Sequence, residues 1–291
     1  HMNPIIIILF NFFTGTLCLI TGVNFLSSGL EDANSKLLKK ALTGFTGKLP
    51  YAFVTGTVVT ALLQSSTAVT IITVGFVNSG IMKLAQAVGI IYGANIGTTV
   101  TAQLMAFRIT DAGLPLIAAG AAAGFFARST TAKSLCKAVA GFGLMFLGLG
   151  ILHSGVPLIK ESKFIYEIFM KYGNNPYIGL LIGLITTMLV QSSSATVGLT
   201  IVLFNASLIT FDAAIGLTLG DNIGTCATAQ IASLRANTWG RRAAWAHTIY
   251  NIIGAVTALL LLEPFSNLIQ YITLLLGQDK TRLVANTHTI F

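Results

Sequence analysis

The sequence predicts an all-α polytopic membrane protein made of two inverted-topology repeats, each with a re-entrant helical hairpin and a broken transmembrane helix. Two observations lead to this fold class. Charged residues are 9% of the chain and hydrophobic residues 54%, whereas ordinary soluble domains carry about 25% charged residues. A long block of the sequence also recurs further along the chain with its polar motifs preserved.

The repeat is found by shifting the chain by 127 positions. Residues 56–108 then align with residues 183–235 without a gap, and 20 of the 53 positions are identical. A shared apolar composition does not explain these identities, because they cluster at polar positions. The matched motifs are Gln64-Ser65-Ser66 with Gln191-Ser192-Ser193, and Asn95-Ile96-Gly97-Thr98 with Asn222-Ile223-Gly224-Thr225.

A glycine stripe extends the repeat upstream. At a shift of 126 positions, Gly15, Gly22 and Gly29 match Gly141, Gly148 and Gly155. Small residues at such spacing let membrane helices approach closely, so we interpret the stripe as a packing face. We expect one membrane domain over residues 1–291 without a soluble appendage, with repeat one at about 3–128, repeat two at about 131–263 and a C-terminal segment at 264–291.

The first elements follow from segment length. Residues 3–29 are long enough to span a hydrocarbon core of about 30 Å at about 1.5 Å per residue. The segment 31–48 holds two acids and four lysines and is expected to lie at the interface. Residues 50–63 and 68–79 are each too short to cross, so the polar residues between them predict a re-entrant hairpin, surrounded by protein or a water-filled cavity.

A broken helix and a short span complete repeat one. Glycines and small polar residues at 93–99 interrupt the run 84–107, which predicts a break near its middle. Residues 112–127 form a short span. Repeat two follows the same order, with a span at 131–155, an interfacial segment at 157–172, a hairpin at 176–207, a broken helix at 211–234 and a span at 242–262.

Topology follows from counting crossings and charges. Each unit crosses three times if hairpins count as zero, and an odd number inverts the second unit relative to the first. This arrangement puts eleven Lys and Arg on one side and six on the other. By the positive-inside rule the first side is cytoplasmic, which predicts a multi-pass protein of the cell inner (plasma) membrane with both termini outside.

Several function classes are disfavoured by the sequence. The three cysteines are scattered singly, so neither a disulfide nor a metal site is indicated. The basic residues lie at segment ends without interleaved aromatics, so we expect no nucleic-acid partner. No nucleophile-base-orienter set or nucleotide loop is recognisable, so we expect no enzyme and no cofactor beyond a coupling ion.

The doubled polar tips suit an anion. Half-helices that begin near Ser66 and Ser193 would point N–H groups and positive dipole ends inward, which favours an oxyanion such as phosphate. For a lone membrane serine, a hydrogen bond to the backbone is the commoner role, but duplication beside a second duplicated motif favours a site. The candidate phosphate-binding residues are Gln64, Ser65, Ser66, Thr67, Gln191, Ser192, Ser193, Ser194, Asn95 and Asn222.

A cation is expected to accompany the anion. Carbonyl oxygens freed at the breaks, with Asn and Gln side chains, suit Na⁺, and a buried anion among neutral groups is unfavourable unless cations enter with it. This mutual dependence is cotransport. Asp221 stands where repeat one has Ala94, and it is either a sodium ligand, a proton carrier or a structural acid. The candidate sodium ligands are Gln64, Ser65, Thr98, Thr99, Gln191, Ser192, Asp221, Asn222, Thr225 and Thr248.

Two further polar groups have open roles. His247, Thr248 and Asn251 share one face of the last span, where a packing role is more usual for a lone histidine than a proton relay. Gln103 and Gln230 are repeat partners, two turns past each predicted break, and either line a path or serve packing.

These motifs resemble the type II sodium-dependent phosphate cotransporter family in a compact bacterial form. The residues that carry the resemblance are Gln64-Ser65-Ser66-Thr67, Gln191-Ser192-Ser193-Ser194, the stretches 93–99 and 220–225, and Arg241-Arg242-Ala243 leading to Ala246-His247 and Asn251. The resemblance implies symport of inorganic phosphate with Na⁺ through inverted repeats, with the tip serines contacting phosphate.

We therefore expect a secondary active transporter that imports inorganic phosphate with Na⁺ by alternating access. Its expected partners are phosphate, Na⁺ and the lipid bilayer, and a homodimer is left open. Two alternatives remain: a sodium-coupled transporter of another anion, such as sulfate or a dicarboxylate, and a passive anion channel.

Overall fold

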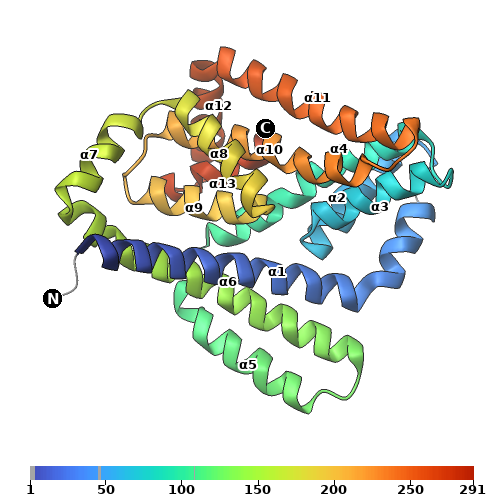
Figure 1. Ribbon diagram of the computed structural model, residues 1–291, viewed down its shortest axis with the longest axis horizontal. Helices are drawn as coiled ribbons and strands as arrows, with labels where there is room; N and C mark the ends of the chain where they lie inside the picture. Colours follow the sequence, from blue (N-terminus) through green and yellow to red (C-terminus); the bar gives the residue numbers. More distant parts are fainter. Residues whose placement is uncertain (1–3, 45–46, 108) are drawn as a thin grey trace.

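The computed structural model describes residues 4–44, 47–107 and 109–291, and this part of the chain folds into helices without strands (Figure 1). The first repeat region holds α1 (Pro4–Gly44), α2 (Leu49–Leu63), α3 (Ser66–Asn78), α4 (Leu84–Met105), η1 (Thr110–Ala112) and α5 (Gly113–Phe126). The second holds α6 (Thr130–Glu161), α7 (Lys163–Tyr172), α8 (Pro176–Val190), α9 (Ser193–Asn205), α10 (Phe211–Ser233) and α11 (Thr238–Leu260). The C-terminal segment forms α12 (Leu262–Leu275), η2 (Lys280–Arg282) and α13 (Leu283–Ile290).

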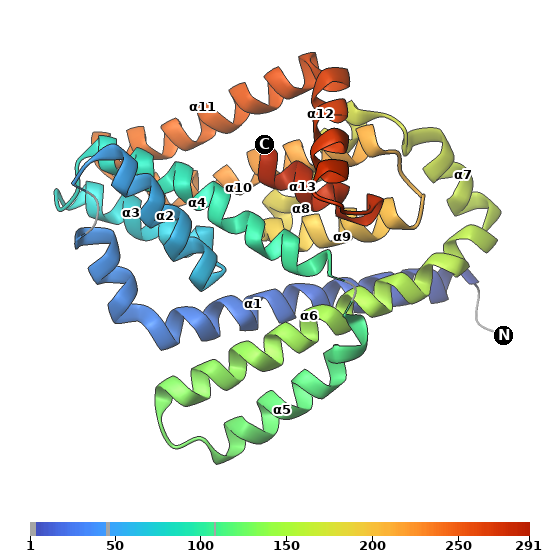
Figure 2. The same ribbon diagram turned by 180° about the vertical axis from the view of Figure 1, so that it is seen from behind.

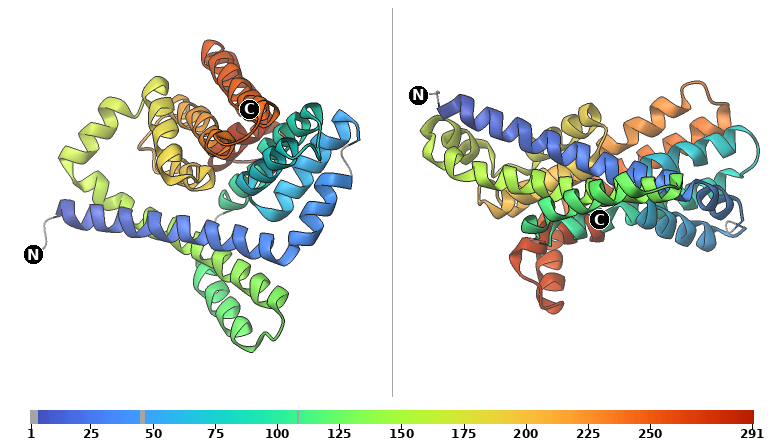
Figure 3. Two further views of the ribbon diagram at one scale, coloured as in Figure 1. Left: turned by 45° about the vertical axis from the view of Figure 1, so that its right-hand side comes forward. Right: turned by 90° about the horizontal axis from the view of Figure 1, so that it is seen from below.

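The glycine stripe packs the two longest helices together. α1 and α6 lie side by side across the molecule (Figures 1 and 3), with Gly15 against Leu152 and Gly29 against Ala138. A Cβ on Gly22 would overlap the Met145 backbone. The contacts pair later residues of α1 with earlier residues of α6, so the two helices are antiparallel. The predicted packing role of the stripe is confirmed.

Two hairpin units of the same build lie on one side of this pair, opposite α5 (Figures 1 and 2). In the first, α2 has 15 residues and α3 has 13, and in the second α8 has 15 and α9 has 13. α2 packs on α4, and in the same way α8 packs on α10. We call α4 and α10 the core helices, because α3 also packs on α10 and α9 on α4, each on the core helix of the other unit. The short paired helices expected on either side of each polar tip are therefore present.

The predicted helix breaks are wrong. α4 and α10 run without interruption through 93–99 and 220–226. Their hydroxyls bond backbone carbonyls of the preceding turn instead of disrupting it, as Thr98 Oγ does with Ala94 O at 3.0 Å and Thr225 Oγ with Asp221 O at 3.0 Å. No backbone carbonyls are therefore freed by a break in either helix.

The glycines of α4 and α10 serve close packing. A Cβ on Gly93 would overlap the carbonyl oxygen of Phe53 on α2, and a Cβ on Gly220 would overlap that of Leu180 on α8. Helix weakening by glycine, about 1 kcal/mol relative to alanine, is offset where the missing side chain lets a neighbouring helix approach this closely.

Two span boundaries differ from prediction. α1 continues to Gly44, and its backbone leaves helical geometry at Asn34 (φ −122°, ψ 18°) rather than at residue 30. α6 continues through Pro157 to Glu161, so only α7 remains as a separate amphipathic segment. The beginning of each polar stretch therefore extends the spanning helix, and α7 is the separate element that the second stretch predicted.

Membrane-spanning length is found in three helices of the described chain, Ile5–Gly44, Thr130–Glu161 and Thr238–Leu260, or in up to five spans if two bent helix pairs each count as one. The protein is thus a multi-pass helical membrane protein by length and composition. α5 packs on the face of α6 that points away from the hairpin units (Figure 2), whereas α11 packs on α3, α4 and α10.

Candidate functional site

The two polar tips have the same backbone geometry. Gln64 and Gln191 close α2 and α8 in the left-handed region, with φ of 56° and 54°. The next residues, Ser65 and Ser192, are N-caps of α3 and α9, and their hydroxyls accept from the backbone N–H of the residue three positions on. α3 begins at Ser66 and α9 at Ser193, as predicted. The first amides of each helix have no intrahelical acceptor.

One cavity joins the two tips. It has a volume of about 420 Å³, and we call it the tip cavity. Its lining from the hairpins and α4 is Gln64, Ser65, Ser66, Thr67, Thr98, Gln191, Ser192, Ser193 and Ser194. Residues that are 127 positions apart in sequence thus face the same space, and two helix N-termini converge there. Amide and hydroxyl donors in this arrangement suit an oxyanion.

The remaining lining comes from α1 and α6, and sequence reasoning missed it. α1 contributes Asn24, Ser27, Ser28 and Glu31, and α6 contributes Lys137, with Val23 and Phe25 beside them. A spacing of three or four residues puts these four α1 residues on one helix face. This polar stripe on an apolar helix is the sequence signal that could have indicated a cavity wall. The tips carry no charge, but the cavity therefore has one cation and one carboxylate in its wall.

The first tip is held more firmly than the second. Ser27 Oγ donates to the Gln64 carbonyl at 2.6 Å, and Thr101 Oγ donates to Gln64 Oε1 at 2.7 Å. Gln64 is buried, whereas its repeat partner Gln191 is exposed. The side chain of Gln64 is thus engaged by α4, whereas Gln191 is exposed, and both glutamines line the cavity.

The predicted Asn95 and Asn222 do not line the tip cavity. They share a separate small cavity of about 20 Å³ with Thr99, Asn251 and His288, enough for about one water or ion. Asn95 Oδ1 lies 3.0 Å from His247 Nε2, and Asn95 Nδ2 donates to Asn251 Oδ1 at 3.3 Å. The two repeated asparagines are thus brought together, but away from the serines.

Asp221 is fully buried and precedes Asn222, which lines this small cavity. Thr187 Oγ donates to Asp221 Oδ1 at 2.7 Å, and His288 Nε2 lies 3.7 Å from Asp221 Oδ2. Among the described residues, Oδ2 has no hydrogen-bond partner. A buried carboxylate oxygen in this condition favours an arriving cation or proton.

The other predicted sodium ligands have local partners. Thr225 Oγ and Thr99 Oγ each bond a carbonyl of their own helix. Thr248 accepts from Gln230 Nε2 at 2.7 Å and lies outside both cavities. The candidate ligands therefore fall into two groups, one at the tips and one around Asp221, with Thr248 apart from both.

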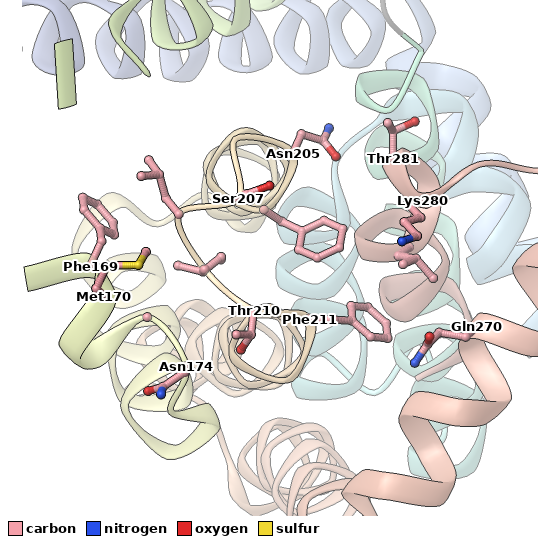
Figure 4. Close-up of a pocket in the computed structure, with 15 residues that line it drawn as sticks. Phe169, Met170, Asn174, Asn205, Ser207, Thr210, Phe211, Gln270, Lys280 and Thr281 are labelled. Atoms are coloured by element: carbon pink, nitrogen blue, oxygen red, sulfur yellow. The ribbon is translucent and has the colours of Figure 1, made fainter. Parts of the chain in front are cut away.

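A larger cavity of about 750 Å³ lies at the turn between α9 and α10 (Figure 4). Asn205, Ser207 and Thr210 line it from the turn, facing Gln270 and Lys280 from the C-terminal segment. Lys280 is the single charged residue in its lining, and neither doubled motif reaches it. The tip cavity is therefore the better candidate for the substrate.

Apolar spanning helices, two matched hairpins and a shared polar cavity define a helical membrane transport protein. Comparison with known proteins gives the family. The model of the Na⁺/Pi-cotransporter family matches residues 18–154 and 161–277, which is most of the chain. The chain belongs to this family, which is one of transporters and not of enzymes, and the resemblance found in the motifs is confirmed.

Individual relatives agree with this assignment. YqeW of Bacillus subtilis is 28% identical over 286 residues, covering 98% of this chain and 91% of that protein. YjbB of Salmonella typhimurium, named for inorganic phosphate export, is 29% identical over 94% of this chain and 50% of that protein. Human sodium-dependent phosphate transport protein 2B is 32% identical over 168 residues, 52% of this chain and 24% of that protein.

Coverage differs between these relatives. The chain spans about half the length of the YjbB proteins and a quarter of the human protein. No solved structure matches the chain. Family membership supports phosphate transport across a membrane.

Proposed function

We propose that the protein imports inorganic phosphate together with Na⁺ by alternating access around the tip cavity. The observation that carries the proposal is that both capped tips line one cavity, so that two helix N-termini and serines from both repeats converge on the same space. Phosphate fits these donors, and Lys137 in the wall adds attraction for an anion. The family match supports phosphate as the substrate class.

Inverted repeats provide the mechanism of access. α1 and α6 match at a shift of 126 positions and run antiparallel, which is the relation expected between corresponding helices of inverted units. We place both termini outside the cell inner membrane, since eleven basic residues then lie on the cytoplasmic side. Rocking of one unit against the other would open the tip cavity to each side in turn.

Sodium coupling has an electrostatic rationale. A phosphate in the tip cavity faces mainly neutral donors, so cations that enter with it lower its free energy of binding. Asp221, whose Oδ2 accepts no hydrogen bond from the described residues, is our candidate for one cation ligand, and the tip hydroxyls are candidates for another.

Uptake into proteoliposomes tests the proposal. With radiolabelled phosphate outside, an inward Na⁺ gradient should drive accumulation above the external concentration, and a K⁺ gradient should not. Equal uptake in both gradients would contradict coupling, and uptake that stops at equilibration would indicate a passive channel. Unlabelled sulfate and dicarboxylates, added as competitors, distinguish phosphate from other anions.

Phosphate export is the second candidate, favoured by the name of the YjbB relatives. Export against a normal inward Na⁺ gradient needs a driving force other than Na⁺ symport. Vesicles preloaded with phosphate should therefore retain it under an inward Na⁺ gradient if the protein is an importer. Faster loss under an inward proton gradient without Na⁺ would favour export.

The tip serines provide the site test. Ser66→Ala and Ser193→Ala should each reduce phosphate transport strongly while the protein stays folded, because each removes a hydroxyl from the cavity wall. Unchanged phosphate affinity in both variants would remove the tip cavity as the site.

A further inference from the structure

Two helices outside the hairpin units carry the same short motif. Residues Arg241, Ala244, His247, Thr248, Ile249 and Tyr250 are followed 41 positions later by Arg282, Ala285, His288, Thr289, Ile290 and Phe291. The first copy lies on α11, and the second runs from η2 through α13. The offset differs from that of the main repeat, so the 127-position alignment does not find this similarity.

The threonines of the two copies make equivalent hydrogen bonds. Gln230 Nε2 on α10 donates to Thr248 Oγ at 2.7 Å. Gln103 Nε2 on α4 donates to Thr289 Oγ at 3.0 Å. Gln103 and Gln230 occupy matching positions in the main repeat. The helix that bonds Gln230 of repeat two is α11, and the helix that bonds Gln103 of repeat one is α13, so α11 and α13 hold corresponding positions relative to the two repeats.

The arginines of the two copies also contact the core helices, α10 and α4. Arg241 Nη2 donates to the carbonyl of Leu234 at 3.2 Å, just past the end of α10. Arg282 Nη1 donates to the carbonyl of Gln103 at 2.8 Å, and its guanidinium lies 4.0 Å from the centre of the Phe107 ring, just past the end of α4. Phe107 is the repeat partner of Leu234. Each arginine therefore contacts the end of one core helix at matched positions.

The histidines face matched stretches of the core helices. His247 Nε2 lies 3.0 Å from Asn95 Oδ1 on α4, and because an amide oxygen only accepts, the imidazole donates. His288 Nε2 lies 3.7 Å from Asp221 Oδ2 on α10. Asn95 aligns with Asn222, the neighbour of Asp221. Both histidines are buried, and Figure 2 shows α13 lodged beside α4 and α10.

We propose that α11 and α13 are structurally equivalent helices, one for each repeat, in place of the pairing of 112–127 with 242–262 that the order of the segments predicts, and that His247 and His288 are positioning residues that orient Asn95 and Asp221. α11 packs on α3, α4 and α10, and α13 packs on α9, α10 and α4. These two sets correspond, because α3 of repeat one matches α9 of repeat two and α4 matches α10. The C-terminal helix is on this proposal an integral part of the transport core.

The two positions differ in chemistry. The imidazole N–H of His247 donates to the neutral side-chain amide of Asn95, and that amide in turn donates to Asn251. The ring of His288 meets a carboxylate oxygen without another partner among the described residues. His288 therefore orients the group with the stronger attraction for a cation, and loss of His288 should act on the cation rather than on phosphate.

The equivalence of α11 and α13 is tested by thermal unfolding in detergent, which requires no transport. Gln103→Leu with Thr289→Val, and Gln230→Leu with Thr248→Val, should each lower the Tm by less than the sum of the single changes, since both members of a pair break the same glutamine–threonine hydrogen bond. Gln103→Leu also removes the hydrogen bond to Asn286 Oδ1, and that loss is the same in the single and the double variant. The crossed pair, Gln103→Leu with Thr248→Val, is the matched control and should be additive. Additive shifts in the α13 pair would overturn the equivalence.

The positioning role rests on the proposed sodium coupling and is tested by uptake. His288→Leu should raise the Na⁺ concentration for half-maximal uptake about fivefold or more, while the phosphate KM at saturating Na⁺ changes less than about twofold. His288→Gln, which retains a donor, should restore the Na⁺ response, and Asn267→Ala on the exposed face of α12 should have no effect. Equal defects in the Leu and Gln variants, or a defect confined to maximal rate, would overturn the role. If uptake by the unsubstituted protein is independent of Na⁺, the proposed coupling fails, whereas the unfolding test of the helix pair still stands.

Discussion

Thr187 Oγ donates a hydrogen bond to Asp221 Oδ1 at 2.7 Å, between α8 and α10. In repeat one, Thr60 on α2 matches Thr187, and Ala94 matches Asp221. The Thr60 hydroxyl therefore has no carboxylate opposite it, and among the described residues it has no hydrogen-bond partner. Both threonines are buried. The repeats thus share the buried threonine but differ in the carboxyl group that accepts its hydrogen bond.

Thr187→Val should destabilise the protein by about 1–3 kcal/mol, because the methyl leaves Asp221 Oδ1 buried without its donor and also removes the hydrogen bond between Thr187 Oγ and Thr196 Oγ at 2.7 Å. Thermal unfolding in detergent measures the change. Thr218→Val on α10 is the control, since its buried hydroxyl bonds the Ala214 carbonyl of its own helix. Equal losses in both variants would mean that the hydrogen bond to Asp221 has no special weight.

Thr60→Val should be neutral or stabilising by up to about 1 kcal/mol, because it removes a buried hydroxyl that makes no hydrogen bond. Opposite signs at Thr60 and Thr187 in the same unfolding assay would verify that the two repeat-equivalent threonines differ in environment. A loss at Thr60 as large as that at Thr187 would contradict this reading of repeat one.

Gly93→Ala and Gly220→Ala should each destabilise by about 1–3 kcal/mol or prevent folding, since the added Cβ would overlap a carbonyl oxygen of α2 or α8. Gly75→Ala on α3 is the control, with nothing within 4 Å of its added Cβ, and should stabilise by up to about 1 kcal/mol through helix propensity. Yield and thermal unfolding are the measurements. Tolerance of alanine at both Gly93 and Gly220 would refute the close packing.

Ser27→Ala should raise the phosphate KM by up to about tenfold, because it removes the hydroxyl that holds the Gln64 carbonyl at the first tip. Ser28→Ala provides the control within the same cavity wall, as Ser28 Oγ bonds the Asn24 carbonyl of its own helix. Transport kinetics in proteoliposomes give both values, and an equal change in the two variants would show that the tip anchor is unimportant.

Lys137→Gln should raise the phosphate KM several-fold, and the rise should shrink in high salt, because the lysine attracts the anion through a screened field. Lys137→Arg should retain low KM. Lys133→Gln, one turn earlier on α6 and outside the cavity lining, serves as the control. No difference between the variants at 133 and 137 would remove Lys137 from the substrate path.

Local features of this fold were accessible from the sequence. The hairpin helices end and begin at the expected residues, because two apolar runs too short to span must turn at the polar stretch between them, and a serine after Gln64 or Gln191 is a natural N-cap. The glycine stripe of α1 and α6 was also predictable, since its seven-residue spacing keeps the glycines on one helix face.

The helix breaks show why the rest was not accessible. Gly93 and Thr98 weaken an isolated helix, but whether the helix opens depends on α2, which packs against Gly93, and on the Ala94 carbonyl, which accepts from Thr98. Lys137 is inaccessible to sequence reasoning for a similar reason: in the sequence it counts as one of the eleven basic residues of one membrane side, and only the packing of α6 brings it to the tips.

The sequence by itself determined the membrane class, the doubled tips and their caps, because these depend on hydrophobic length and on hydrogen bonds within a few residues. Only the tertiary structure decided that the serines and the asparagines occupy separate cavities, and that α13 places His288 beside Asp221. Those arrangements depend on contacts between distant segments, whose free energies are set by helix packing that no local pattern encodes.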